Sequence, residues 1–409
     1  MHIGTGIVEG WRRLVGALVL VVSVAAVAAP PVAAQPLYPV PDPDPFYAAP
    51  PDVARYAPGD VIDSRPMPPL LEFPGTEVRM VKFRSTNSAG DPIAATSIVL
   101  KPSGFRANAP VLSYQHIING LGTKCAVSRA LYSSDPLLTI REAPALNVAL
   151  QRGWMIALPD HLGPTSAYGA ARLGGMITLD GVRAVHRTPG LDAGASPVAL
   201  AGYSGGGMAT AWAAALQPTY APELRIVGAA AGGVPMNISK MARALGDAPH
   251  PAFGLAMAAA IGLEREYPER FPLSTQLNAK GIALRNQMAN GCTNEILGNG
   301  VGRSVPELAA SKALQTDPRA WAVGDENSLE FYAGVPAMPI YEWHSPIDGL
   351  IPIDSIDVTV RRYCGAGVRI QSETFTSPDH LTTAVLGLPA ALHYVDERFR
   401  GVPAPSNCR

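Results

Sequence analysis

Charge is sparse in this sequence and is nowhere concentrated. Only 16% of the 409 residues are charged, the formal net charge is −1 at pH 7, and no run of Lys and Arg interleaved with aromatic residues occurs. Phosphate backbones require such a basic surface, so nucleic acid is not expected as a partner. Disorder is excluded as well, because 47% of the residues are hydrophobic and the chain is long enough for one large domain with an inserted subdomain.

Cysteine is also scarce, with four widely separated copies: Cys125, Cys292, Cys364 and Cys408. No Cys-x-x-Cys motif and no Cys/His spacing typical of zinc sites is present, and the histidines are scattered, so we expect no metal and no cofactor. An even number of cysteines forms disulfides by default in an oxidising compartment, and four cysteines allow three pairings.

Residues 1–34 have the pattern of an export signal. Arg12 and Arg13 precede an almost wholly apolar stretch over 14–29, and small residues at 32–34 favour cleavage before Gln35. The paired arginines also permit the twin-arginine route. An uncleaved anchor is the alternative, although the apolar stretch falls just short of the roughly 20 residues that a membrane span needs. We therefore expect a protein that is secreted or held in the cell envelope.

Four further segments follow the signal. Residues 35–75 are crowded with proline, which opposes regular strand pairing and predicts an extended arm. Residues 76–235 and 336–409 are predicted to form the two parts of one core. Between them, residues 236–335 do not continue the pattern of the core, and we interpret them as a mainly helical cap.

Short apolar runs alternate with helical stretches through the core. The predicted strands are 77–85, 93–101, 111–114, 154–158, 198–201, 225–230, 338–343 and 368–374, and the predicted helices include 142–152, 179–187 and 382–399. Turn residues at 87–92 join the first two strands as a hairpin. The later alternation indicates an α/β fold with a mostly parallel sheet covered by helices on both faces.

One segment of the cap, residues 251–263, carries no charge at all. Three interpretations are open for this segment: it is buried, it faces lipid, or it lines an apolar tunnel. A helix that packs the cap onto the core is favoured, because a helix that is apolar all round is usually buried. Its thirteen residues are too few to span a bilayer.

The motif Gly202-Tyr203-Ser204-Gly205-Gly206 has the form Gly-x-Ser-x-Gly. In α/β hydrolases this motif places a nucleophilic serine on a tight turn between a strand and a helix. Five residues alone could arise by chance in a glycine-rich chain, but a β-rich run precedes this one and a run of small helix-forming residues, 208–216, follows it. We therefore predict Ser204 as the nucleophile.

A serine nucleophile needs an imidazole base, which follows it in the chain order of this fold. His380 lies in the predicted loop between the last strand and the C-terminal helix, where it can reach the serine. His393 falls within that helix and is expected to be packed, and His344 comes too early to follow an acid. His380 is the predicted base.

The acid that orients the base should follow the penultimate strand. Asp348 stands in a loop flanked by Pro and Gly, directly after residues 338–343. Asp354 is the nearest rival, at the start of a helix where an acid is commonly a cap, and Asp379 is a weaker one. We predict Asp348.

The oxyanion hole requires two backbone N–H groups. One is expected from Gly205, and the other from the loop after residues 111–114, where Asn119 is the choice. Gln115 and His116 of the same loop are candidates for supporting roles. The pair Asp160-His161 also invites a catalytic reading, but it precedes the nucleophile and is expected to be a loop anchor.

Short elements in a specific order resemble the secretory lipase family of α/β hydrolases. They are Asp44-Pro45-Phe46-Tyr47, Pro58-Gly59-Asp60, Ser64-Arg65-Pro66, Ser113-Tyr114-Gln115 with Asn119 and Cys125, Gly202 to Gly206, Ile347-Asp348 with Ile351-Pro352, and Asp379-His380-Leu381-Thr382. Together they cover nearly all of the mature chain. The position of Asn119 is usually aspartate in the family, a change that a backbone donor tolerates.

The resemblance implies a triad of Ser204, Asp348 and His380 and an oxyanion hole of Asn119 and Gly205. It further implies disulfides Cys125–Cys292 and Cys364–Cys408 and a helical cap around an apolar acyl tunnel. The expected activity is hydrolysis of acylglycerols or other lipid esters, as in a triacylglycerol lipase (EC 3.1.1.3), with transient contact with lipid interfaces and no obligate protein partner. A short-chain esterase or acyltransferase acting on cell-envelope esters is the alternative, and a non-catalytic binding protein is a weaker one.

Overall fold

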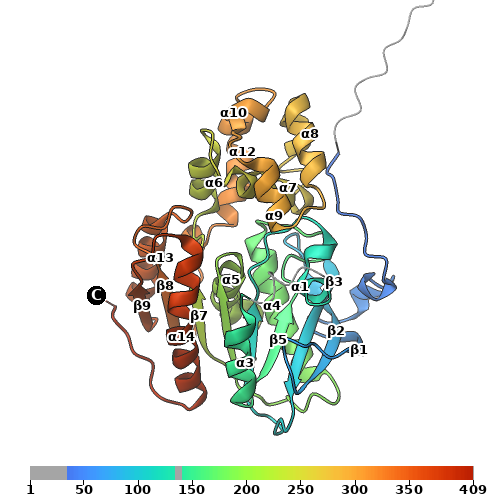
Figure 1. Ribbon diagram of the computed structural model, residues 1–409, viewed down its shortest axis with the longest axis vertical. Helices are drawn as coiled ribbons and strands as arrows, with labels where there is room; N and C mark the ends of the chain where they lie inside the picture. Colours follow the sequence, from blue (N-terminus) through green and yellow to red (C-terminus); the bar gives the residue numbers. More distant parts are fainter. Residues whose placement is uncertain (1–34, 134–140, 409) are drawn as a thin grey trace, which may run out of the picture. The chain divides into compact units, whose positions relative to one another are not determined.

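A nine-stranded mixed sheet forms the centre of the computed structural model, which describes residues 35–133 and 141–408 (Figure 1). The predicted signal segment 1–34 lies outside the described residues. The strands are β1 (Val61–Met67), β2 (Thr76–Thr86), β3 (Pro92–Pro102), β4 (Val111–Gln115), β5 (Met155–Pro159), β6 (Val198–Tyr203), β7 (Ile226–Gly232), β8 (Ile340–His344) and β9 (Ile370–Thr374). Their order across the sheet is β1-β2-β3-β5-β4-β6-β7-β8-β9.

The sheet changes from antiparallel to parallel along its width. The pairs β1–β2, β2–β3 and β3–β5 are antiparallel, and the predicted hairpin is the β2–β3 pair. From β5 through β4, β6, β7 and β8 to β9, every neighbouring pair is parallel. The predicted α/β class, with a mostly parallel sheet in its second part, is confirmed.

The prediction that proline excludes regular pairing throughout 35–75 was wrong for β1. Pro66 lies inside this strand and is paired in register with Arg79 of β2. β1 is the edge strand of the sheet, so one side of its backbone has no neighbour to bond, and proline is tolerated there. The rest of the arm contains only two short 3-10 turns, η1 (Pro45–Tyr47) and η2 (Val53–Arg55).

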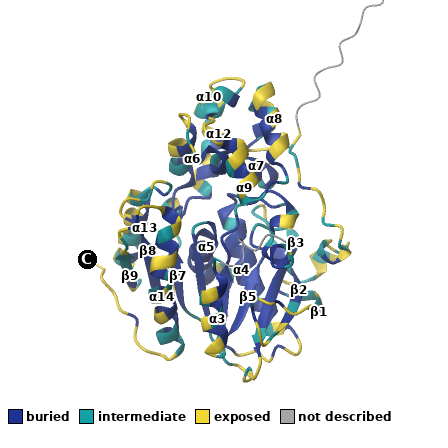
Figure 2. Ribbon diagram, in the orientation of Figure 1, coloured by how far each residue is buried: buried dark blue, intermediate teal, exposed yellow. Residues whose placement is uncertain are grey.

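Helices cover both faces of the sheet. Those of the core are α1 (Val127–Ala130), α3 (Ala143–Gln151), α4 (Ala171–Arg187), α5 (Gly205–Tyr220), α13 (Ile353–Gly365) and α14 (His380–Phe399), with a 3-10 turn η3 (Thr123–Cys125). Side chains alternate along the strands, so Val198 and Leu200 of β6 share one apolar cluster with α4 and α5. Ala199 and Ala201 share the other cluster with α3 and α14. The central strands β4, β5, β6 and β8 are accordingly buried along their whole length, and the outer helix faces are exposed (Figure 2).

Helix α4 begins at Ala171, well before the predicted start at residue 179. Glycines in its first turns obscured this start in the sequence. They are needed for packing, because a Cβ on Gly175 would lie 2.9 Å from the backbone of α5 at Trp212 and Ala213. Close contact between two helices therefore overrides the poor helix propensity of glycine.

The chain between β7 and β8 is mainly helical. It contains α6 (Ile238–Gly246), α7 (Phe253–Glu266), α8 (Ala279–Met288), α9 (Thr293–Gly300), α10 (Val305–Leu308), α11 (Ala313–Thr316) and α12 (Pro318–Glu326), with 3-10 turns η4 (Leu273–Gln276) and η5 (Leu329–Phe331). We propose residues 236–335 of this insertion as the cap. Among the described helices, none is long and apolar enough to cross a membrane.

Two disulfides are present. Cys125–Cys292 joins the loop region after β4 to the start of α9, across 167 residues of chain. Cys364–Cys408 joins the end of α13 to the C-terminal segment. Cross-links of this kind restrict the unfolded chain and so stabilise the folded one.

The buried guanidinium of Arg265 in α7 links the cap to the core through hydrogen bonds. Its side chain, only 3% exposed, donates hydrogen bonds of 2.7–3.1 Å to the carbonyl oxygens of Leu37, Leu121, Thr165, Ser166 and Ala289. Burial lowers the pKa of Arg265 to about 10, so it stays charged at neutral pH. One side chain thus holds the N-terminal arm, two core loops and two parts of the cap.

We expect Arg265→Leu to lower the free energy of unfolding by at least about 3 kcal/mol, because it leaves several buried carbonyl groups without donors. Arg265→Lys is the matched control. It keeps the charge but has no planar fork, so its loss should be smaller. The urea midpoint measures both effects, and an unchanged midpoint for Arg265→Leu would show that the link contributes nothing.

Candidate active site

Ser204 sits on the sharp turn between β6 and α5. Its backbone has φ 55° and ψ −122°, a left-handed conformation that is strained for any residue with a side chain. The Ser204 amide donates to the Gly232 carbonyl at 2.8 Å, which holds the turn against β7. This is the strand-turn-helix geometry in which a Gly-x-Ser-x-Gly serine is exposed above a sheet.

The glycines on either side of Ser204 are required because backbone carbonyl groups lie too close to leave room for a Cβ atom. A Cβ on Gly202 would lie 2.6 Å from the carbonyl group of Gly206. A Cβ on Gly206 would lie only 2.0 Å from the carbonyl oxygen of Gln115 at the end of β4. The turn is therefore pressed against the strand that leads into the loop of Asn119.

His380 and Asp348 form a buried hydrogen-bonded pair. Nδ1 of His380 lies 2.6 Å from Oδ2 of Asp348, and their side chains are only 6% and 0% exposed. Burial alone would raise the pKa of Asp348, but the hydrogen bond and charge of His380, with the amides of Leu350 and Ile351, lower it below its ordinary value. Asp348 is thus held ionised at neutral pH.

The imidazole of His380 is fixed by its neighbours as well. The Tyr203 hydroxyl donates to the His380 carbonyl at 2.6 Å, and the two rings lie 4.9 Å apart. A Cβ on Gly233 would approach the His380 ring to 2.9 Å. His380 begins α14, and Asp379 caps that helix through the Thr382 amide.

The alternative candidates for the acid and the base have partners outside the pair of His380 and Asp348. Asp354 is exposed and pairs with Lys240 in the first turn of α13, and His344 lies 3.0 Å from Glu342. His393 does lie in the C-terminal helix, but the expectation that it is packed was wrong. Its side chain is 67% exposed, because it falls on the outer face of α14.

Asn119 and Gly205 lie next to each other. A Cβ on Gly205 would be 3.3 Å from Oδ1 of Asn119 and 3.5 Å from the carbonyl oxygen of Ile118. Both residues line one cavity together with Ser204 and His380. The fold therefore brings together all five residues that the sequence pointed to: Ser204, Asp348, His380, Asn119 and Gly205.

A buried acid that the sequence analysis did not single out supports this loop. Glu142, at the start of α3, forms an ion pair with His116 and accepts a 3.2 Å hydrogen bond from the Ile117 amide. Burial opposes the charge of Glu142, but His116, Arg141 and the Ile117 amide lower its pKa overall. Gln115 accepts a hydrogen bond from Thr210 of α5 at 2.7 Å. No local pattern indicates Glu142, because the loop residues that it holds, His116 and Ile117, precede it by 25 residues or more.

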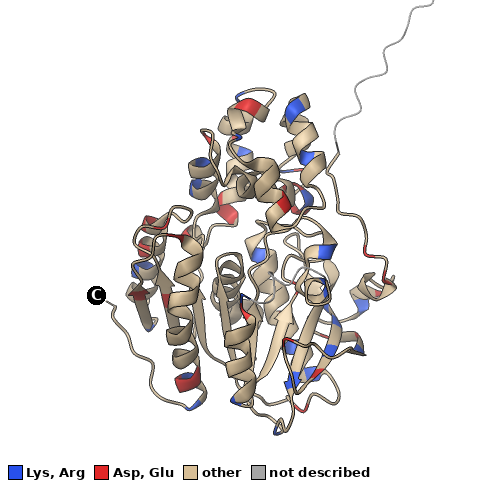
Figure 3. Cartoon of the chain, viewed as in Figure 1, with Lys and Arg blue, Asp and Glu red and all other residues tan. Residues whose placement is uncertain are grey.

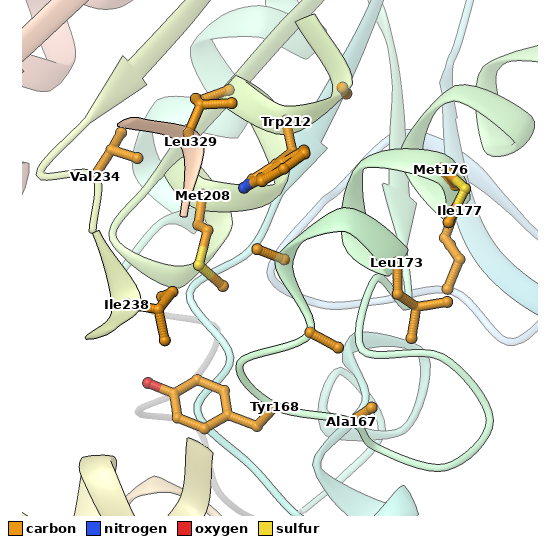
Figure 4. Close-up of a cluster of buried hydrophobic side chains, with 14 of the residues drawn as sticks. Ala167, Tyr168, Leu173, Met176, Ile177, Met208, Trp212, Val234, Ile238 and Leu329 are labelled. Carbon is orange, nitrogen blue, oxygen red and sulfur yellow. The ribbon is translucent and has the colours of Figure 1, made fainter. Parts of the chain in front are cut away.

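The cavity that Ser204 lines holds about 970 Å³ of empty space, including its opening to solvent. Its walls are mainly apolar, and Figure 4 shows Tyr168, Met208 and Ile238 gathered there. Charged residues are scattered over the described chain with both signs interspersed (Figure 3). Arg141 is the one charged side chain among the described residues that line this cavity, apart from His380 when protonated.

A second cavity, with about 760 Å³ of empty space including its opening to solvent, is lined by residues of the cap. The two cavities share four lining residues, Ile238, Ala242, Ala256 and Ala259. Helix α7 contains most of the uncharged segment 251–263, and this part of the helix buries its larger side chains and presents small alanines to both cavities. This segment is therefore packed in the interior and also lines an apolar space, which are two of the three interpretations that its sequence allowed.

Asp160 and His161 lie outside the cavity that Ser204 lines. Asp160 accepts hydrogen bonds from the Ser128 amide at 3.0 Å, the Ser128 hydroxyl at 2.6 Å and Thr96. Burial lowers the pKa of His161 to about 4, so this residue is neutral at pH 7. Neither residue lines the cavity of Ser204, in keeping with a loop anchor.

Within 35–133 and 141–408, no three His, Cys, Asp or Glu side chains gather as a metal-binding group.

Comparison with known proteins shows the family of the chain. Residues 133–407 match the secretory lipase family. Lipase A of Arthroderma benhamiae is 33% identical over 393 residues, which cover 90% of this chain and 82% of that protein. A probable trichothecene esterase of Stachybotrys chartarum is 31% identical over 371 residues, covering 87% and 76% respectively.

Similar solved structures are also lipases and esterases. The closed state of Candida antarctica lipase A superposes with a TM-score of 0.84 at 28% identity, covering 91% of this chain and 89% of that one. The rice cell wall degrading esterase LipA of Xanthomonas oryzae, at 15% identity and a TM-score of 0.66, shares the fold. The chain therefore belongs to the secretory lipase family, and it is a lipase- or esterase-type hydrolase of lipid esters with the α/β-hydrolase fold.

Proposed function

We propose that the protein cleaves lipid esters through an acyl-enzyme on Ser204, with His380 as base and Asp348 as the acid that orients it. The observation that carries this proposal is the buried 2.6 Å hydrogen bond from His380 to Asp348, in a mainly apolar cavity that the strained turn of Ser204 also lines. A serine hydroxyl becomes a nucleophile only when such a base takes its proton.

In the proposed mechanism, Nε2 of His380 removes the proton from the Ser204 hydroxyl as Oγ attacks the ester carbonyl. The backbone amides of Asn119 and Gly205 stabilise the oxyanion. His380 then protonates the leaving alcohol. It next activates a water that releases the fatty acid and regenerates Ser204. Asp348 keeps the imidazole in the required tautomer and stabilises its positive charge.

For the substrate, we propose a triacylglycerol or a similar lipid ester whose acyl chain enters the cap. The support is the shared apolar wall between the cavity of Ser204 and the cavity inside the cap. An apolar cavity binds a hydrocarbon chain by removing it from water, at about 0.8 kcal/mol for each buried CH₂ group. The disulfides and the signal-like segment 1–34 support a secreted enzyme.

A second candidate is an esterase or acyltransferase that acts on shorter or cell-envelope esters. One relative is named a probable esterase, and the same catalytic residues serve any acyl acceptor. Cleavage of tributyrin without any cleavage of long-chain triacylglycerol would favour this candidate over a lipase. Product analysis with an added alcohol separates hydrolysis from acyl transfer.

We expect Ser204→Ala to lower kcat on p-nitrophenyl esters by at least about 10⁴-fold, because no other group can form the acyl-enzyme. The matched control is Ser311→Ala, at an exposed serine of the cap that lines neither cavity, and it should keep wild-type kcat. A fluorophosphonate probe should label the wild type and leave Ser204→Ala unlabelled. Undiminished hydrolysis by Ser204→Ala would refute the mechanism.

Ala256 is half-buried on α7 and lines both cavities. Ala256→Phe should block passage from one to the other, so kcat/KM for a p-nitrophenyl ester of sixteen carbons should fall by about tenfold or more, in line with the loss of two or three buried CH₂ groups. The four-carbon ester should be little affected. Ala256→Ser, which keeps the volume, is the control. Equal losses on both esters would exclude the cap cavity as the acyl site.

A further inference from the structure

The loop that carries Asn119 is fastened to the cap as well as to the core. The Thr293 hydroxyl, at the first residue of α9, donates a 3.1 Å hydrogen bond to the carbonyl oxygen of Asn119 across 174 residues of chain. Both residues line the cavity of Ser204. The cap therefore touches the backbone of a proposed oxyanion-hole residue directly.

Several further contacts join residues 290–293 of the cap to the loop that follows β4. We call this line of contacts the seam. The residue before Thr293 is Cys292, which is disulfide-bonded to Cys125. The Leu121 amide donates to the carbonyl oxygen of Gly291 at 2.9 Å. The approach is close, since a Cβ on Gly122 would lie 2.5 Å from the carbonyl oxygen of Asn290. This seam sets the position of Thr293 relative to the loop.

The core holds the loop at its other end. The Ile117 amide is bound by the buried carboxylate of Glu142 at 3.2 Å. The carbonyl oxygen of Ile118 lies beside Gly205. The peptide group that contributes the Asn119 N–H thus lies between two anchors, Glu142 acting on Ile117 and Thr293 acting on the Asn119 carbonyl. Without the second anchor, that peptide can rotate away from the direction of a developing oxyanion.

We propose that Thr293 of the cap is a positioning residue for the oxyanion hole, which it orders through the carbonyl group of Asn119. The inference rests on the proposed function, because it requires that the Asn119 amide stabilise the transition state. Preorganised donors accelerate acyl transfer only when they point to the place where charge develops. The cap then contributes to the chemical step, in addition to enclosing the acyl chain.

A structural explanation makes a different prediction. In that explanation the Thr293 hydroxyl only satisfies the carbonyl group of Asn119, where the loop meets the cap. Its removal would then lower stability by about 1 kcal/mol and leave kcat unchanged. A positioning role carries the same loss of stability, but it also lowers kcat and weakens binding of tetrahedral analogues, while KM changes little.

The test compares Thr293→Val, which keeps the shape and removes the hydroxyl, with Thr293→Ser, which restores it. A p-nitrophenyl ester of four carbons is the substrate, so that the cap cavity is not probed. For Thr293→Val we expect kcat to fall by about tenfold with KM nearly unchanged, a smaller loss than the roughly 100-fold that follows removal of a whole oxyanion donor. The inhibition constant of a trifluoromethyl ketone should rise in the same ratio, and Thr293→Ser should recover most of the activity.

Three results would overturn the inference. One is wild-type kcat in Thr293→Val. Another is an equal loss in Thr293→Val and Thr293→Ser. The third is a lower kcat with an unchanged inhibition constant for the ketone. The Ser204→Ala variant, measured in parallel, separates the two proposals. If it retains hydrolysis, both the proposed function and this inference fail, whereas wild-type kcat in Thr293→Val beside an inactive Ser204→Ala refutes the inference alone.

Discussion

The contact between Gly206 and the end of β4 organises the rest of the site. β4 and β6 are parallel neighbours with Gln115 opposite Gly202, so the turn that leaves β6 meets the loop that leaves β4 at the same edge of the sheet. Because a Cβ on Gly206 would lie 2.0 Å from the Gln115 carbonyl oxygen, only glycine allows this approach. As a consequence, Ser204 lines the cavity and Gly205 is set beside Asn119.

Buried polar pairs then supply the orientation that an apolar cavity cannot. His380 with Asp348, and His116 with Glu142, are each enclosed by the core and satisfied by amides as well as by each other. Burying an unpaired carboxylate is costly, so each acid constrains the position of its partner. The first pair holds the proposed base, and the second holds the loop of the proposed oxyanion hole.

The insertion between β7 and β8 has two kinds of contact with this site. Helix α7 provides apolar surface, with small alanines facing both cavities. The segment around Cys292, together with Arg265, provides polar and covalent contacts to the loop that follows β4. The proposed cap is thus joined to the core by a disulfide and by hydrogen bonds close to the residue that we assign to the oxyanion hole.

By itself, the sequence determined the alternating strands and helices, the β2–β3 hairpin, the strand-turn-helix setting of Ser204 and the chain order of Asp348 and His380, because periodicity and turn residues act over short distances. Tertiary structure decided that Pro66 pairs at a sheet edge, that α4 starts at Ala171 and that His393 is exposed. It alone brought Glu142 and Thr293 to the loop of Asn119. Such contacts join residues up to 174 positions apart, and no local pattern encodes them.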